Sequence, residues 1–156
     1  MATFVAQRAS ANKPVFKPLG SGLLAVAWGS YTLTAALAAA DIVQFCRLPP
    51  NAIVLGGFLR AQDIDTGTGV FDFDMGWAAN GSEAADPDGF GNFGALNGTA
   101  VANHLPEGGI LLPFHGVLAL GPVSFSKETI IQGVCNVAPN AGGTGVMTAV
   151  VHYTVA

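Results

Sequence analysis

Two short segments match motifs of nucleotide-binding or catalytic sites. Residues 89–94 have the spacing G-x-G-x-x-G, and Ser124 and Lys127 form an S-x-x-K pair. The first motif binds a pyrophosphate only between a parallel strand and a helix, and the second acylates only at a helix start with S-D-N and K-T-G elements nearby. An acidic stretch precedes residues 89–94, a Gly-Pro turn precedes Ser124, and both companion elements are missing from the sequence. We therefore predict a flexible loop at 89–94 and a turn into a strand at Ser124.

Seven of the ten acidic residues lie between Asp63 and Asp88, and six of them form D-x-D pairs. Two carboxylates on one strand face can hold Ca²⁺, and paired carboxylates also hydrolyse glycosides. The sequence has neither the ligand order of an EF-hand nor a sign of an aromatic-lined cleft. We interpret the pairs as a solvated acidic face, with calcium binding as the open alternative; the pairs are Asp63/Asp65, Asp72/Asp74 and Asp86/Asp88.

The histidines and cysteines do not form a recognisable site either. His104, His115 and His152 are too far apart for a local pair of metal ligands and are predicted at turns or on the surface. Arg47 would lower the pKa of the neighbouring Cys46 thiol, but a nucleophile also needs a base and an oxyanion hole. Two cysteines, Cys46 and Cys135, are too few for a disulfide framework, so we expect them to remain reduced. We assign no catalytic residue, no metal and no cofactor.

Composition and charge argue against a nucleic-acid-binding protein and suggest a surface that partners cover. The 156 residues are enough for one domain. Hydrophobic residues make up 51% and charged residues only 10%, against a usual ~25% charged, which suggests a surface that is buried against partners. A net charge of −4 with six Lys and Arg argues against nucleic acid. The uncharged stretch 18–40 imitates an export signal, but Gly, Ser and Thr dilute it, so we expect neither export nor a membrane span.

The positions of apolar residues predict an all-β fold, specifically a jelly-roll-like antiparallel β-sandwich. Phe71, Phe73, Met75 and Trp77 alternate with polar residues, as do Met147 to Val155. Residues 52–55 are apolar on both faces, which indicates a strand covered on both sides. Residues 63–69 are predicted to be a hairpin loop. The predicted strands lie near 22–28, 31–37, 41–47, 52–62, 70–77, 110–120, 128–136 and 145–155.

An extended N-terminal arm, residues 1–20, is expected to precede the sandwich domain, residues 21–156, which contains a long loop excursion at about 78–109. The arm holds half of the basic residues, two prolines and scattered aromatics, with no sustained period. An arm that cannot bury its aromatic residues on itself needs other contacts to become ordered. We expect it to bind a neighbouring subunit or a larger assembly, and the alternative is an arm packed along its own sandwich. The expected interface residues are Phe4, Arg8, Lys13, Phe16 and Lys17.

The segment from Asp41 to Trp77 carries a resemblance to a protein family. It contains Asp41-Ile42-Val43, then Leu48-Pro49-Pro50-Asn51-Ala52, then Asp63-Ile64-Asp65-Thr66-Gly67 and Phe71-Asp72-Phe73-Asp74-Met75-Gly76, and the chain closes on an alternating Tyr153-Thr154-Val155. In order and spacing this resembles tailed-bacteriophage virion structural proteins of the capsid decoration (cement) type. The excursion at 78–109 and the basic arm depart from the family pattern.

The resemblance implies a non-enzymatic decoration subunit that binds the outer surface of a phage capsid and stabilises contacts between capsomers. The implied partners are the major capsid protein and further copies of this chain, with a trimer favoured at a local three-fold site. The implied location is the virion surface, after assembly in the host cytoplasm. Three alternatives remain: another virion component such as a head fibre base, tail or glycan-binding protein; a calcium-dependent carbohydrate-binding module; and a hydrolase that uses Cys46 or the acidic residues.

Overall fold

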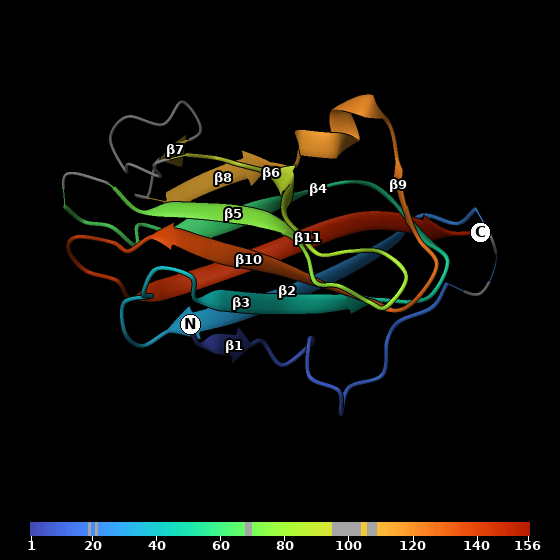
Figure 1. Ribbon diagram of the computed structural model, residues 1–156, viewed down its shortest axis with the longest axis horizontal. Coiled ribbons are helices and arrows are strands. Elements are labelled where there is room, and N and C mark those ends of the chain that lie inside the picture. The colour runs from blue at the N-terminus through green and yellow to red at the C-terminus, as the bar shows by residue number, and fades with distance from the viewer. Residues whose placement is uncertain (19, 21, 68–69, 95–103, 106–108) are drawn as a thin grey trace.

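Alternating apolar residues build two β-sheets that face each other in a computed structural model of the chain (Figure 1). The structure describes residues 1–18, 20, 22–67, 70–94, 104–105 and 109–156. In the first sheet the strand order is β1 (Thr3–Val5), β3 (Ile42–Leu48), β10 (Thr129–Val137), β5 (Asp72–Trp77) and β6 (Asp86–Gly91). In the second the order is β2 (Ala25–Leu33), β11 (Gly145–Val155), β4 (Ala52–Gln62), β8 (Gly109–Pro113) and β7 (His104–Leu105), with β9 (Val123–Phe125) also paired to β4.

The strand pairing is nested, which confirms the predicted jelly-roll sandwich. β2 pairs with β11, β3 with β10, β4 with β8 and β9, and β5 with β6, all antiparallel. Consecutive strands from β1 to β5 alternate between the two sheets. This is the pattern of an antiparallel ribbon wound into two layers.

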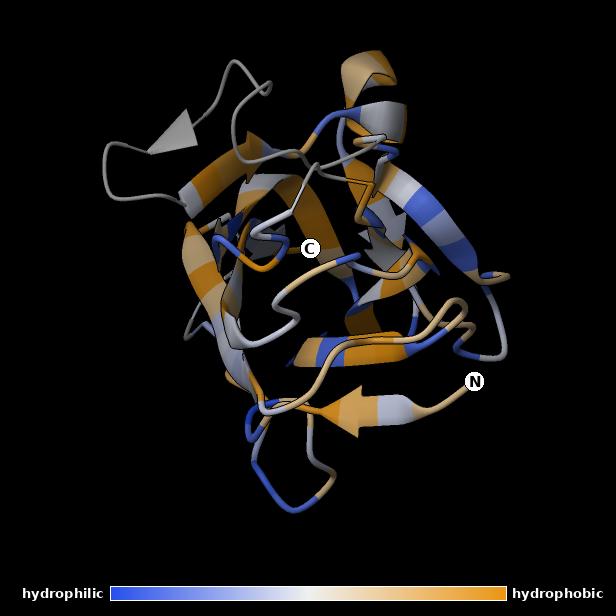
Figure 2. Ribbon diagram, turned by 90° about the vertical axis from the view of Figure 1, so that its left-hand side faces the viewer, coloured by the Kyte–Doolittle hydropathy of each residue, from blue (hydrophilic) through white to orange (hydrophobic). Residues whose placement is uncertain are grey.

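The core lies between the sheets and contains the inward-facing residues of the predicted alternating strands. Phe71, Phe73 and Met75 are at most 1% exposed. Met147, Ala149, Val151 and Tyr153 of β11 are fully buried, as their alternation predicts. Figure 2, turned by 90° from Figure 1, shows the two layers with hydrophobic residues, in orange, on the strands of both.

Several element predictions need correction. The two strands predicted at 22–28 and 31–37 are replaced by one strand, β2, which covers only Ala25–Leu33. The strand predicted at 110–120 ends at Pro113 and is followed by a short 3-10 helix, η1 (Gly116–Leu120). The region 78–109, expected to be a loop, contains β6 and β7. The strand at 52–55 is not covered on both sides, because Leu55 on the outer face of the second sheet is 49% exposed.

The segment Pro49–Asn51 turns the chain from the first sheet into the second. Asn51 has a φ of 61°, and the backbone N–H of Ala52 donates to the carbonyl of Pro49 at 3.3 Å. A type II turn requires a positive φ at its third position and commonly has proline at its second. The Leu-Pro-Pro-Asn-Ala sequence thus fixes the entry into β4, as its residue types predict.

The loop after β4 is a crossing between sheets, not the predicted hairpin, because β4 and β5 belong to different sheets. Asp65 organises this crossing and is 3% exposed. Burial alone would raise the pKa of Asp65, but backbone N–H donors together lower it below its ordinary value of 3.8. At 3.0–3.3 Å, its carboxylate accepts hydrogen bonds from the N–H groups of Gly67, Val70, Phe71 and Ala141.

We predict that Asp65→Asn, which keeps the size of the side chain, lowers the free energy of unfolding by about 2–3 kcal/mol, because an amide nitrogen then faces backbone donors. A carboxylate with a lowered folded pKa stabilises the protein above its unfolded pKa, and this contribution is lost as the pH falls. The deficit should therefore shrink on acidification. Urea unfolding measures it, with the exposed Asp63→Asn as the control; equal stability of both variants at neutral pH would contradict the role of Asp65.

β2 of the second sheet lies close against β3 of the first at Gly29. A Cβ atom added to Gly29 would lie 1.8 Å from the carbonyl oxygen of Phe45, whereas one added to Gly56 would meet no atom within 4 Å. We predict that Gly29→Ala destabilises the fold by about 3 kcal/mol, because the backbone of β3 must move. Gly56→Ala, also on a strand of the second sheet, is the matched control and should change thermal stability little. A tolerated Gly29→Ala would show that the sheets separate easily.

Candidate functional site

The two motifs of nucleotide-binding and catalytic sites begin on strands, β6 and β9. β6 runs antiparallel to β5, so residues 89–94 lack the parallel strand that a nucleotide site requires. The prediction of a flexible loop there is wrong, because Phe90 is fully buried and stacks on Phe114 with ring centroids 5.2 Å apart. Ser124 lies on β9, as the predicted turn into a strand requires, and not at a helix start.

The two thiols are buried and are not poised for nucleophilic attack. Burial raises the pKa of Cys46 to about 12, so the predicted lowering by Arg47 is wrong. The Arg47 guanidinium instead forms an ion pair with Glu128. Burial, together with the charges of Asp41 and Asp72, raises the pKa of Cys135 to about 11. Both cysteines are free, as expected.

The described residues do not assemble a metal centre. Within that part of the chain, no three His, Cys, Asp or Glu side chains are placed to hold an ion. His115 is exposed, and His152 is half-buried beside the ring of Phe58. His104 lies on β7, and its side chain is outside the described residues. No helix in the described residues is long and apolar enough to cross a membrane.

The acidic residues fall into two groups rather than one solvated face. Asp65 is structural, and Asp74, on β5, is only 6% exposed and accepts a hydrogen bond from Asn136 at 2.6 Å. Burial, followed by the charges of Asp72 and Asp88, raises the pKa of Asp74 despite the Asn136 hydrogen bond. Burial, a hydrogen bond shared with Asp88 and the Asp88 charge raise the pKa of Asp86. The carboxylates of β5 and β6 therefore repel one another.

We predict that Asp86→Asn raises the melting temperature at about pH 7 by roughly 1–3 °C, because it removes part of this repulsion. A raised folded pKa means that ionisation of Asp86 opposes folding, so stability falls as the pH rises through the folded pKa. The gain should therefore vanish as the pH falls towards the ordinary value of 3.8. Circular dichroism melts at several pH values test this, with the exposed Asp63→Asn as the control. A lower melting temperature at neutral pH would contradict the repulsion.

The first residues of the arm are part of the chain's own sandwich, as in the alternative of an arm packed along it. β1 pairs in parallel with β3, and the Asp41 carboxylate accepts a hydrogen bond from the Ala2 N–H at 2.6 Å. Phe4 packs against Tyr31, with ring centroids 5.7 Å apart. Pairing with β3 supplies the contacts that this part of the arm was expected to need from a partner.

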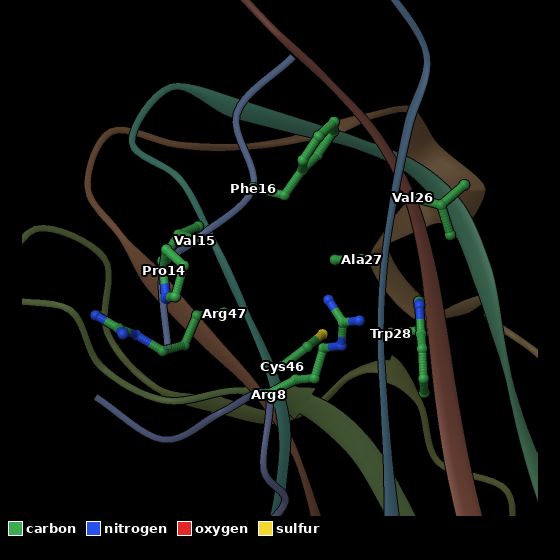
Figure 3. Close-up of a pocket in the computed structure, with 9 residues that line it drawn as sticks. All are labelled: Arg8, Pro14, Val15, Phe16, Val26, Ala27, Trp28, Cys46 and Arg47. Carbon is green, nitrogen blue, oxygen red and sulfur yellow. The ribbon is translucent and has the colours of Figure 1, made fainter. Parts of the chain in front are cut away.

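The rest of the arm leaves a groove at the side of the sandwich (Figure 3). The Arg8 guanidinium lies 4.6 Å from the centre of the Trp28 ring, which is 44% exposed. Phe16 is 59% exposed, while its carbonyl accepts a hydrogen bond from the Tyr153 hydroxyl at 2.8 Å. A hollow of about 250 Å³, lined by Gln7, Arg8, Lys13 and Pro14, shares Arg8 and Pro14 with the groove of Figure 3. We call the groove and this hollow together the arm groove.

Two of the expected interface cations, Arg8 and Lys13, thus line the same hollow. Lys13 and Lys17 are exposed, and the only ion pair among the described residues is that of Arg47 with Glu128. The charges of Arg8, Lys13 and Lys17 are therefore unpaired within the described chain.

Sequence reasoning missed the exposed position of Trp28. The sequence does contain a signal for this exposure, because Trp28 is two and four residues before the polar Ser30 and Thr32 and therefore shares their face of β2.

No protein-family model and no curated protein matches the sequence. The fold is similar to chains in three solved structures. A chain in a structure of the capsid of Ralstonia phage GP4 is 17% identical with a TM-score of 0.77, over 99% of both chains. A chain of the cyanophage Pam1 capsid asymmetric unit is 23% identical with a TM-score of 0.66, over 94% of this chain and 96% of that one. A third, in an acidic stable capsid structure of Helicobacter pylori bacteriophage KHP30, is 12% identical with a TM-score of 0.54, over 86% and 90%.

Proposed function

We propose that this chain is a structural protein of a bacteriophage virion, a decoration subunit that binds the outside of the capsid and stabilises contacts between capsomers. The observation that carries the proposal is the similarity in fold, over 99% of both chains, to a chain of the Ralstonia phage GP4 capsid. The nearly complete coverage in both directions means that the two chains are of similar length. The proposed partners are the major capsid protein and further copies of this chain, as a trimer.

The surface of the chain supports a role based on buried area rather than on chemistry. The outer face of the second sheet exposes Val26, Trp28, Leu55 and Leu111 by 36–49%. Across this face, Trp28 is paired in register with Val150, which in turn is paired with Phe58. A row of apolar side chains across several strands is typical of an interaction surface. Repetition over many equivalent sites of a shell would add avidity to a modest single contact.

Capsid shells that lack this protein provide the direct test. Purified protein mixed with such shells should cosediment in a saturable, stoichiometric amount and raise the temperature at which the shells disassemble. A copy number near that of the shell subunits supports decoration, whereas a few copies per virion would favour a head fibre base, tail or glycan-binding role. Binding to glycans only when calcium is present would favour the carbohydrate-binding module, and no binding to shells would refute the proposal.

The exposed arm residues are the proposed contact with the shell or with a neighbouring subunit. We predict that Phe16→Ser weakens shell binding by about tenfold, because a truncated aromatic anchor costs more than 1 kcal/mol. Its fold should persist, since the hydrogen bond from Tyr153 is made to the backbone of Phe16. Lys17→Glu should weaken binding in the same cosedimentation assay. Val137→Ser and Lys127→Glu, which alter exposed residues outside the arm, are the matched controls. Equal binding by all four variants would exclude the arm.

A further inference from the structure

Among the described residues, charges of opposite sign that form no ion pair lie at opposite edges of the first sheet. Its strand order places β1 and the arm at one edge and β6 at the other. Figure 1 shows the dark-blue arm on one side of the molecule and β6 with η1 on the opposite side. Arg8 and Lys13 lie at the arm edge, and Asp86 and Asp88 lie on β6. Because they are on opposite edges, these charges cannot neutralise each other within one copy.

The acidic edge also carries an exposed apolar side chain. η1 is held against β6, since the His115 N–H donates to the Phe90 carbonyl at 2.8 Å. The contact is close, because a Cβ atom added to Gly116 would lie 2.4 Å from the Gly89 carbonyl oxygen. Leu120 ends η1 and is 94% exposed. A half-buried and an exposed carboxylate thus lie on an element adjoining that of an exposed leucine, and we call the three residues the β6–η1 edge: Asp86, Asp88 and Leu120.

The arm groove has the complementary composition. Arg8 and Lys13 line the hollow of about 250 Å³. Phe16 and Trp28, which flank the groove, are 59% and 44% exposed and provide apolar surface beside these cations. Arg8 is held in place over the Trp28 ring. A positioned guanidinium next to apolar surface suits a ligand that combines carboxylates with an aliphatic group.

We propose that the β6–η1 edge of one copy of this chain docks into the arm groove of the next, with Asp88 and Asp86 meeting Arg8 and Lys13 and with Leu120 packing beside Phe16 and Trp28. Such a contact is head-to-tail, so repeating it generates a ring when the rotation closes. The proposal rests on the proposed function, which includes self-association, and names the two surfaces through which copies of the chain associate. Its test contains no capsid, so the two can fail separately.

The charges at the acidic edge favour a second copy as the partner. The repulsion among Asp74, Asp86 and Asp88 acts against folding of the isolated chain. A cation from a neighbouring copy would relieve it, and the chain itself supplies unpaired cations at its other edge. Complementary charges also orient the two partners as they meet. Asp86→Asn should therefore stabilise the isolated chain but weaken its self-association, two opposite effects that a purely structural role would not produce.

Sedimentation velocity on the purified full chain, over a concentration series, tests the proposal. The chain should associate reversibly, and raised salt should weaken the association. Arg8→Glu and Asp88→Lys should each weaken it by about tenfold or more, because like charges then face each other. The double variant Arg8→Glu/Asp88→Lys exchanges the two charges and should restore association. The controls are Arg60→Glu and Asp63→Lys, which reverse exposed charges at neither edge.

Leu120→Ser provides a test that does not depend on folding, because this side chain is 94% exposed in the single copy. It should weaken association by about tenfold, and the similarly designed Leu55→Ser on the outer face of the second sheet should not. A chain that stays monomeric throughout the series would overturn the proposal. So would association that survives both Arg8→Glu and Leu120→Ser, or a folded double variant that remains monomeric.

Discussion

The fold depends on carrying the backbone between two sheets without leaving buried N–H groups unpaired. Each crossing of the chain from one sheet to the other needs hydrogen-bond acceptors, because an unpaired buried N–H donor costs about 1–3 kcal/mol of folding free energy. At the crossing from β4 to β5 the Asp65 carboxylate supplies them. Just before β3 the Asp41 carboxylate accepts from the N–H groups of Ala2 and Ala38 at 2.6 and 2.9 Å. The jelly-roll winding thus uses carboxylates as backbone acceptors.

This use separates the acidic residues by the direction of their pKa shifts. Hydrogen bonds from backbone N–H groups lower the pKa of Asp41. At Asp65, burial raises the pKa, but the backbone hydrogen bonds together lower it further than burial raises it. Burial and neighbouring carboxylates raise the pKa values of Asp74 and Asp86. The first two stabilise the fold in their ionised form, whereas ionisation of the other two opposes it. A charged group that the fold does not stabilise is a candidate contact for a partner.

The sequence predicted the sandwich and the faces of β5 and β11, because sustained alternation over a buried strand leaves one arrangement that removes apolar surface from water. It did not predict β2 as one strand, since Gly29 interrupts the alternation and its role is a contact with Phe45, distant in sequence. β6 was missed because Pro87 and glycines resemble a loop. The hairpin at 63–69 was wrong, since a local turn signal does not reveal that β4 and β5 belong to different sheets. At the candidate site, charge and aromatic content selected the arm residues as candidates, but their positions depend on contacts that only the fold reveals.

The position of the arm constrains how this chain can bind. Residues 3–5 are a strand of the first sheet, and the Tyr153 hydroxyl binds the Phe16 carbonyl, so the arm is tied to the sandwich at both ends. A free tether would lose about 1–2 kcal/mol of conformational entropy per residue when it binds, whereas an arm already ordered on its own sheet has lost most of that entropy during folding. Fixed cations and aromatics beside the groove can then bind at little further entropic cost. The proposed partner would therefore be recognised by the shape and charge of a preformed surface rather than by an arm that folds around it.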